Sequence, residues 1–201
     1  MRIGIIGSGN GGGSLANGFV RHGHDVMLGT RDATKPAVLE FVEASDGRGR
    51  AGTYAEAARY GDIVITAYPG SLVEETVAAI GPENLAGRLV IDTANPIARV
   101  DGEVRAAYGD DDSAAEVLQR AVPTARVVKA YNTVWASRMV DPDPNDGSTT
   151  MRIAGNDADA KVEVTELLES TGWKVHDVGD LTRARELEAE VVQWAARMPV
   201  E

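Results

Sequence analysis

The residues of this chain whose spacing most directly suggests chemistry are glycines close to the N-terminus. Gly7, Gly9 and Gly12 fill the three glycine positions of the G-x-G-x-x-G dinucleotide fingerprint. In that fingerprint the first glycine makes a tight turn, the second lets the backbone approach a pyrophosphate, and the third lets a helix pack closely on a strand. Because the N-terminus of that helix attracts anions, the stretch predicts a dinucleotide site that includes Ser8 and Asn10.

The elements around these glycines argue against a loop that serves only as a turn. An apolar run, Ile3 to Ile6, precedes them, and a helix-like segment with Leu15 and Phe19 four residues apart follows. That segment ends at Gly23, before a second apolar run. The motif requires this order of strand, glycine loop and helix.

The end of the second expected strand, Asp25 to Gly29, indicates which dinucleotide is bound. Proteins that prefer NAD usually carry Asp or Glu there to bond the ribose 2′-hydroxyl. This chain has Gly29 instead, followed by Thr30, Arg31 and, one turn later, Lys35. An arginine fork matches phosphate oxygens, so we predict that these three side chains hold the 2′-phosphate of NADP(H). The alternative is that Arg31 and Lys35 are ordinary surface charges.

Three later loops follow expected strands and should lie at the same edge of the sheet, where ligands of open α/β sheets bind. They read Ala67-Tyr68-Pro69, Thr93-Ala94-Asn95-Pro96 and Asn132-Thr133-Val134-Trp135. The first two predict that Ala67, Tyr68 and Asn95 line the ribose and nicotinamide. The third predicts that Asn132, Thr133, Val134 and Trp135 face the second substrate.

None of these loops offers a convincing general acid or base, and the only nearby lysine, Lys129, lies inside a strand. Reduction of a carbonyl or imine usually needs a proton donor. Hydride passage between two ring cofactors needs mainly stacking at about 3–3.5 Å in a dry pocket. We therefore predict no catalytic side chain, with hydride transfer achieved by positioning. The alternative is that Asn132 to Trp135 form only a polar strand end.

Composition excludes several other classes of protein. The chain has 201 residues, a formal charge of −11, no cysteine and three histidines. An acidic chain is a poor partner for nucleic acid or an anionic membrane, and disulfides and thiolate chemistry are excluded. No histidine cluster has metal-ligand spacing, so no metal is expected. The start of the chain leads directly into a strand and no apolar run approaches about 20 residues, which predicts a cytoplasmic protein.

The whole chain alternates short apolar runs with helical segments, which predicts a doubly wound, mostly parallel Rossmann-type α/β sheet. Pro- and Gly-rich breaks separate about eight expected strands, at residues 3–6, 25–29, 50–52, 62–66, 88–92, 125–131, 150–154 and 173–178. Capping boxes are expected at Thr53, Ser71 and Ser113, and residues 97–112 should be an irregular excursion. We expect one NADP-binding domain over residues 1–201, with a C-terminal strand–helix extension from about residue 140.

The last expected helix carries Leu187, Val191, Trp194 and Met198 on one face, at spacings of three and four. Such a stripe is more often core or a subunit contact than a ligand surface. It predicts a homodimer.

Six segments together resemble a known family: GIIGSGNGGGSLA, LGTRD, DIVITAYP, VIDTANP, KAYNT and DVGDL-x-x-AR-x-LE. They are similar to the NADPH-dependent reductases of coenzyme F420, an 8-hydroxy-5-deazaflavin, and to related domains in the cytoplasmic part of membrane ferric reductases. The resemblance implies that NADP(H) is held by Ser8, Asn10, Thr30, Arg31 and Lys35. It also implies that backbone groups at Asn132 and Val134 contact the deazaflavin ring.

The leading hypothesis is therefore an oxidoreductase that moves a hydride between NADP(H) and coenzyme F420 or a flavin. One alternative is an NADP(H)-dependent reductase of a small metabolite. Another is a non-catalytic NADP(H)-sensing domain that signals through a partner.

Overall fold

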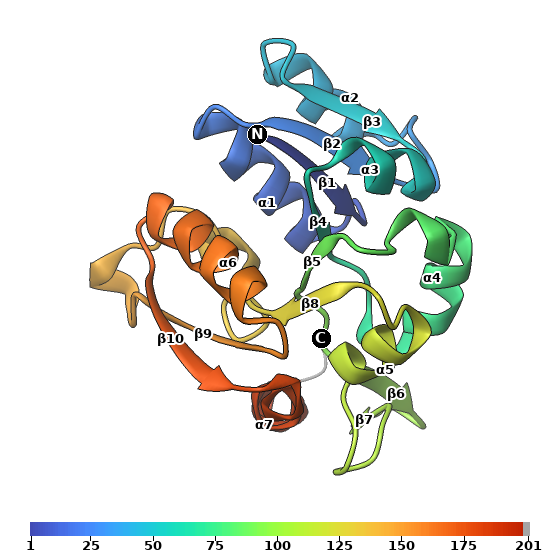
Figure 1. Ribbon diagram of the computed structural model, residues 1–201, viewed down its shortest axis with the longest axis vertical. Helices are drawn as coiled ribbons and strands as arrows, with labels where there is room; N and C mark the ends of the chain where they lie inside the picture. The colour runs from blue at the N-terminus through green and yellow to red at the C-terminus, as the bar shows by residue number, and fades with distance from the viewer. Residues whose placement is uncertain (199–201) are drawn as a thin grey trace.

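One eight-stranded sheet runs through the molecule, with its strands in the order β10-β9-β8-β5-β4-β1-β2-β3 (Figure 1). The computed structural model describes residues 1–198, apart from the side chain of Asp146. The strands of this sheet are β1 (Arg2–Ile6), β2 (Asp25–Gly29), β3 (Gly49–Gly52), β4 (Ile63–Thr66), β5 (Leu89–Asp92), β8 (Arg126–Lys129), β9 (Thr150–Gly155) and β10 (Lys174–Gly179).

Helices cover both faces of the sheet. They are α1 (Asn10–Arg21), α2 (Pro36–Ala44), α3 (Tyr54–Tyr60), α4 (Val73–Ile80), α5 (Ala114–Ala121), α6 (Ala158–Ser170) and α7 (Ala184–Ala196). Helices α1, α2 and α6 pack into one core cluster, and α3, α4 and α5 into the other, on opposite faces of the sheet (Figure 1). This is the doubly wound arrangement that the sequence predicts.

The strand order identifies the edge at which a ligand should bind. Strands β3-β2-β1-β4-β5-β8 run parallel in the 3-2-1-4-5-6 order of two mononucleotide-binding halves, and the order reverses between β1 and β4. Strand β9 pairs antiparallel with β8 and parallel with β10. The predicted mostly parallel sheet is confirmed.

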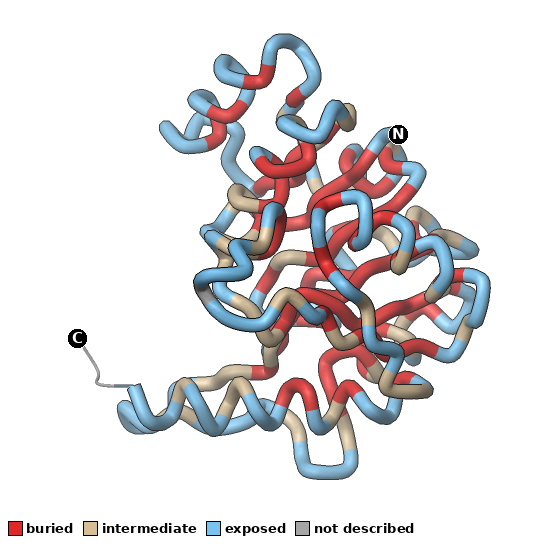
Figure 2. The backbone as a smooth tube through the Cα atoms, turned by 90° about the vertical axis from the view of Figure 1, so that its left-hand side faces the viewer, coloured by how far each residue is buried: buried red, intermediate tan, exposed pale blue. Residues whose placement is uncertain are grey.

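Burial on both faces explains why the central strands β1, β4 and β5 are mainly apolar runs rather than alternating ones. In β1, Ile3 and Ile5 pack into the core on the α1 side, while Ile6 packs into the core on the α3 side. All three are fully buried. Figure 2 shows buried residues along the centre of the molecule and exposed ones over its surface.

Residues 97–106, expected to be irregular, form a β-hairpin of β6 (Ile97–Val100) and β7 (Glu103–Ala106). The turn is Asp101-Gly102, and both residues have positive φ, of 52° and 83°. Asp-Gly between strands favours the two-residue turn that needs this conformation. The prediction was wrong, although the sequence contained the signal.

The three expected capping boxes have three outcomes. Thr53 makes the complete box at the start of α3. The hydroxyl of Ser113 accepts from the backbone N–H of Glu116. The Glu116 carboxylate, however, accepts from that hydroxyl and not from the Ser113 backbone N–H, so the box is incomplete. The box at Ser71 is wrong, because residues 70–72 form a 3₁₀ turn and α4 begins at Val73 without a side-chain cap.

None of the helices described in residues 1–198 has the length and apolar character needed to cross a membrane.

Candidate functional site

The loop between β1 and α1 has the geometry that the glycine fingerprint requires. Gly7 has a φ of 120°, a conformation that side chains disfavour. A Cβ on Gly12 would lie 1.8 Å from the carbonyl oxygen of Gly7, so α1 packs directly on the turn. A Cβ on Gly9 would meet nothing within 4 Å. Gly7 and Gly12 are therefore fixed by the fold, while Gly9 faces open space in front of the N-terminus of α1.

We expect Gly12→Ala to destabilise the fold by about 1–3 kcal/mol, since the new methyl group overlaps backbone that cannot move away. Urea unfolding followed by circular dichroism measures this. Gly13→Ala is the matched control in the same turn of α1, because a Cβ on Gly13, unlike one on Gly12, would meet nothing within 4 Å. Equal stability of the two variants would show that the close contact is not needed.

The end of β2 lies against the glycine loop through two hydroxyl groups. Ser8 Oγ and Thr30 Oγ1 are 2.8 Å apart, and Thr30 Oγ1 also accepts from the backbone N–H of Asp32 at 3.2 Å. Arg31 and Lys35 are exposed beside them. The Asp32 carboxylate accepts two bonds from Thr34, at 2.9 and 2.6 Å, and these hydrogen bonds lower its pKa. This carboxylate is thus engaged in its own turn, and two cations remain exposed at the end of β2.

The loops after β4 and β5 differ in what they present. The carbonyl oxygen of Ala67 lies 2.3 Å from where a Cβ on Gly7 would be, so this loop packs against the glycine turn. The Tyr68 side chain is buried in the core on the α4 side. Tyr68 therefore offers backbone rather than its ring at this edge of the sheet.

Asn95 and Asn132 form a reciprocal pair of amides that joins the ends of β5 and β8. Asn95 Nδ2 donates to the Asn132 carbonyl oxygen at 2.9 Å, and Asn132 Nδ2 donates to Asn95 Oδ1 at 3.0 Å. Asn132 Nδ2 also donates to the carbonyl oxygen of Leu187 in α7, at 3.0 Å. Both side chains brace the site, and the sequence did not indicate the contact with α7.

Tyr131, immediately before this pair, adopts a left-handed backbone conformation with a φ of 63° while its side chain is fully buried. A bulky residue rarely adopts this conformation, and such strain persists only where the surrounding packing holds it. It turns the chain sharply out of β8 and into the Asn132–Trp135 loop. The sequence carries no signal for this conformation.

A fully buried cluster of charges lies behind the amide pair. Lys129 Nζ donates to Asp92 Oδ2 at 2.7 Å, to Glu188 Oε1 at 2.6 Å and to the carbonyl oxygen of Ala94. Burial opposes the charge of the lysine, but the two carboxylates raise its pKa above the ordinary value. Thr66 adds a bond from its hydroxyl to Asp92 Oδ1 at 2.6 Å.

Glu188 connects this cluster to two helices. It lies in α7, and its carboxylate accepts from the backbone N–H groups of Ala114 and Ala115, at 2.8 and 3.3 Å, at the start of α5. Free N–H groups at a helix N-terminus favour a carboxylate. Burial raises the pKa of Glu188, while Lys129 opposes that shift. The cluster therefore fixes α7 to β5, β8 and α5.

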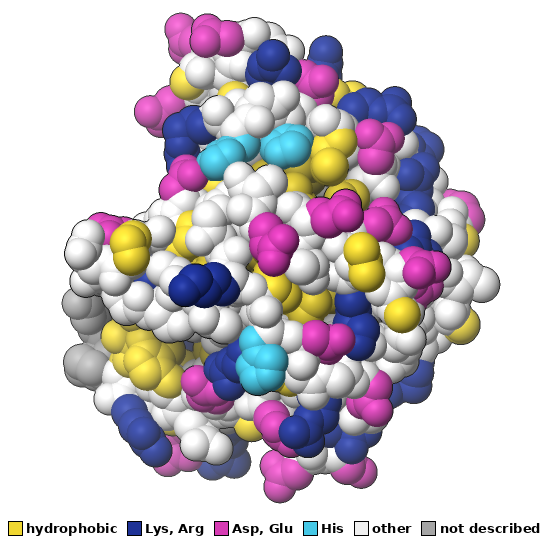
Figure 3. Space-filling view, turned by 60° about the vertical axis from the view of Figure 1, so that its left-hand side comes forward, with side chains coloured by type: hydrophobic (Ala, Val, Ile, Leu, Met, Phe, Trp, Pro, Cys, Tyr) yellow, Lys and Arg dark blue, Asp and Glu magenta, His cyan; other side chains and the backbone are white. Residues whose placement is uncertain are grey.

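Two cavities lie along this edge of the sheet. The first, called here the loop cavity, is about 730 Å³ and is lined by Ser8, Gly9, Asn10, Phe41, Trp135 and Ala136, among others. The second, the α7 cavity, is about 540 Å³ and is lined by Asn132, Val134, Trp135, Ala136, Val191 and Trp194, among others. Trp135 and Ala136 line both cavities, which therefore adjoin. Figure 3 shows hydrophobic side chains gathered in a patch low on the left of one face.

The structure brings together some of the predicted site residues and separates others. All the predicted substrate-binding residues, Asn132, Thr133, Val134 and Trp135, line the α7 cavity together with Asn95. The predicted 2′-phosphate residues Thr30, Arg31 and Lys35 line neither cavity.

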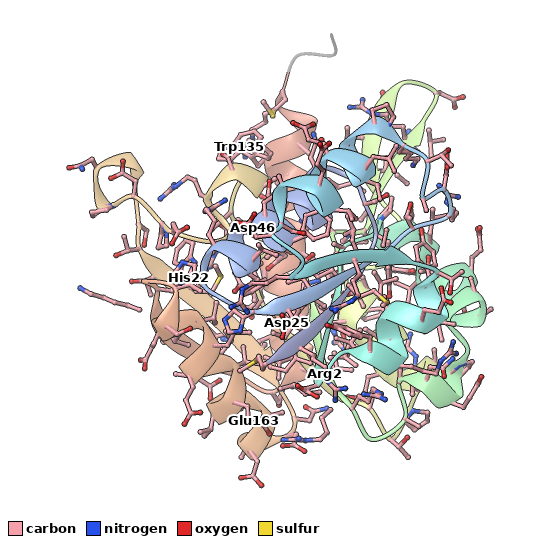
Figure 4. The ribbon with its side chains drawn as sticks, turned by 90° about the horizontal axis from the view of Figure 1, so that it is seen from above. Arg2, His22, Asp25, Asp46, Trp135 and Glu163 are labelled. Atoms are coloured by element: carbon pink, nitrogen blue, oxygen red, sulfur yellow. The ribbon has the colours of Figure 1, made fainter. Side chains whose placement is uncertain are left out.

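The loop that carries Trp135 reaches α1, where Asp141 accepts from Arg21 at 3.0 Å and pairs with His22. Figure 4 shows Trp135 beside α7.

The charges around the α7 cavity are few. Glu190 and Arg197 are its charged lining residues, and Arg152 binds the Glu190 carboxylate at 2.7 Å. The described residues hold no group of three or more histidine, aspartate or glutamate side chains that could bind a metal ion. The cavity thus offers amide, hydroxyl and aromatic groups more than titratable ones.

The strand order, the glycine turn and the site at the switch point define a Rossmann-type dinucleotide-binding protein. Residues 2–96 match the family described as NADP oxidoreductase, coenzyme F420-dependent. The chain is 32% identical over 200 residues to the F420-dependent NADP reductase of Methanothermobacter marburgensis, covering 94% of this chain and 88% of that protein. It therefore belongs to the family of coenzyme F420-dependent NADP oxidoreductases, as the resemblance implied.

Two further proteins are similar to most of this chain. A crystal structure of a protein from Arthrobacter sp. FB24, assigned as an F420-dependent NADP reductase, superposes with a TM-score of 0.90 at 35% identity, covering 97% of this chain and 92% of that one. Metalloreductase STEAP3 of Rattus norvegicus is 30% identical over 190 residues. The match covers 94% of this chain but only 36% of that longer protein.

Proposed function

We propose that this chain transfers a hydride between NADP(H) and a deazaflavin (coenzyme F420) or a flavin. The observation that carries the proposal is the boundary between the two cavities, which share Trp135 and Ala136. A nucleotide on the glycine loop and a second ring in the α7 cavity would meet at this boundary. When bound, NADPH would supply a hydride, that is, one hydrogen with two electrons, to the second ring, and the ring would take the proton that completes its reduction from water.

The chain's own residues supply binding and orientation for the nucleotide. Backbone N–H groups at the start of α1, beside Ser8, Gly9 and Asn10, would receive the pyrophosphate, because that helix end is open and positive. Arg31 and Lys35 would bind the 2′-phosphate. The loops after β4 and β5 would line the nicotinamide side, through the backbone of Ala67 and Tyr68 and through Asn95.

The second substrate would lie against Thr133, Val134 and Trp135. The hydrogen bonds between Asn95 and Asn132 hold this loop in place. The backbone groups of the loop are therefore already positioned before a substrate binds. Hydride transfer between rings depends on such fixed geometry and on exclusion of water. It does not require a proton donor at the reacting carbon, and the titratable carboxylate of the cavity, Glu190, is already held by Arg152.

The test is oxidation of NADPH by purified protein with coenzyme F420, with FMN, and with a small cyclic imine as separate acceptors. We expect turnover with at least one of the two ring acceptors, measured by absorbance decay. Reduction of the imine alone would show a small-metabolite reductase. Tight NADPH binding with no turnover on any acceptor would show a sensing domain.

A homodimer through the apolar face of α7 stays a prediction. Along that face Leu187 is buried, Val191 is partly buried, and Trp194 and Met198 are exposed. Size-exclusion chromatography with light scattering measures the mass directly; a monomer at micromolar concentration would contradict it.

A further inference from the structure

Two exposed tryptophans from distant parts of the chain contact each other at the α7 cavity. The ring centroids of Trp135 and Trp194 are 4.4 Å apart, with an angle of 78° between the planes. This is the edge-to-face arrangement that aromatic pairs prefer. Trp135 is 55% exposed and Trp194 is 42% exposed. The chain has only three tryptophans, so an exposed pair concentrates most of them at one place.

Both rings line the α7 cavity, and Trp135 also lines the loop cavity. The pair therefore forms one wall of the space next to the boundary where the two cavities meet. Edge-to-face contact uses the edge of one ring and one face of the other, so the contact does not use the remaining ring faces, and both residues are partly exposed. An open indole face is a stacking surface for a flat conjugated ring.

The start of α7 holds this wall in position. Asn132 donates to the Leu187 carbonyl oxygen, and Glu188 is bound to the buried Lys129. Trp194 follows Glu188 by six residues, less than two turns of helix. Figure 2 shows that α7 is buried near its start and becomes exposed toward its end. The ring of Trp194 is thus presented by a helix that is fixed at one end.

We propose that Trp135 and Trp194 form an aromatic wall that makes the α7 cavity selective for planar fused-ring acceptors, with Trp194 as a specificity-determining residue. The inference rests on the proposed function and names the part of the site that selects the acceptor. A cavity of about 540 Å³ lies within the range of small-molecule sites, which is about 300–1,000 Å³. A fused three-ring system can cover an indole face and occupy much of this volume. A small imine would contact only part of the wall and gain little from it.

The binding test uses a pair that cannot react, the protein saturated with NADP⁺ and then titrated with oxidised coenzyme F420 or FMN in a calorimeter. We expect Trp194→Ala to weaken binding of the ring about 5- to 10-fold, the loss of one aromatic contact. Trp194→Phe should recover most of it, and the affinity for NADP⁺ should not change. Val162→Ala, an exposed apolar residue on α6, is the control, and circular dichroism checks that each variant is folded.

Unchanged ring affinity in Trp194→Ala would overturn the aromatic wall, whatever the enzyme does in turnover. An equal loss of NADP⁺ affinity would overturn it as well, since the residue would then act on the whole fold. The proposed function fails separately, if the wild-type protein oxidises NADPH with neither ring acceptor. Because the calorimetric test needs no turnover, the two failures are distinguishable.

Discussion

Lys129→Met should destabilise the folded protein by about 3–5 kcal/mol, the usual cost of removing one partner from a buried ion pair. The methionine fills the space of the lysine stem but leaves Asp92 and Glu188 buried close to one another without their cation. Since domains of this kind are stable by only about 5–15 kcal/mol, the loss is a large fraction of the total. Urea unfolding followed by tryptophan fluorescence measures it.

Two comparison variants separate the buried cluster from a general effect of losing a positive charge. Arg105→Met removes a cation from an exposed pair with Glu103 and should cost less than about 1 kcal/mol. The double variant Lys129→Met with Glu188→Gln should be more stable than Lys129→Met alone, because one of the two unpaired charges is gone. If the double variant is no more stable, the two carboxylates do not act through the lysine.

The pH dependence of Lys129→Met has a definite sign. Burial and the nearby Asp92 already raise the pKa of Glu188, and removal of the lysine takes away the main opposing influence, leaving only the hydrogen bond from the Ala114 backbone N–H. A carboxyl whose pKa is higher in the folded than in the unfolded state favours folding at low pH, and this stability is lost as the pH rises through the folded-state pKa. The difference between Lys129→Met and wild type should therefore shrink as the pH is lowered. A constant difference would contradict the account.

Arg31→Ala should reduce the preference for NADPH over NADH by about 1.5–3 kcal/mol, roughly 10- to 150-fold, the value of a hydrogen bond to a charged group. Arg31 is exposed at the end of β2, and the neighbouring Asp32 carboxylate accepts its hydrogen bonds from Thr34. The ratio of kcat/KM for the two nucleotides, with one acceptor throughout, measures the change. The loss should come from NADPH, while the value for NADH stays nearly constant.

The dependence on ionic strength provides a second test of the contact between Arg31 and the 2′-phosphate. Exposed charges are screened over about 10 Å at 0.1 M salt, so the NADPH preference of the wild type should fall as salt is added. The Arg31→Ala variant should be less sensitive. Arg105→Ala, in strand β7, removes an exposed arginine elsewhere in the chain; it is the matched control and should keep the wild-type ratio. A preference unaffected by Arg31→Ala would show that the end of β2 does not bind the 2′-phosphate.

The sequence was most informative where local rules act alone. Strand β2 has the predicted bounds, Asp25–Gly29, and the glycine turn is where the fingerprint places it. A turn with positive φ and a close helix contact demand glycine, so the residue type reports the geometry directly. Buried parallel strands are equally easy to recognise in the sequence, because both of their faces must be apolar.

The contacts that complete the site could not be predicted from the sequence, because they join residues far apart in the chain. Lys129 and Glu188 are 59 residues apart, and Asn132 and Leu187 are 55 apart. A buried lysine needs a partner for its charge, but no local sequence pattern indicates which carboxylate provides it. The same holds for the contact of Trp135 with Trp194, which depends on how α7 returns to the end of β8. Helix α7 was expected to be core or a subunit contact. Its Leu187 is buried, and the helix also contributes Val191 and Trp194 to the lining of the α7 cavity, a role that the sequence did not indicate.

The most direct test of the account uses NADPH that carries deuterium at C4, with separate samples labelled on each face of the ring. After turnover with coenzyme F420, mass spectrometry of the reduced deazaflavin measures whether the label has moved to its carbon-bound position. Direct hydride transfer across the boundary at Trp135 predicts that one of the two labelled samples delivers its deuterium and the other retains it. Reduced deazaflavin without label from either sample, or no oxidation of NADPH with either coenzyme F420 or FMN, would contradict the proposed hydride transfer.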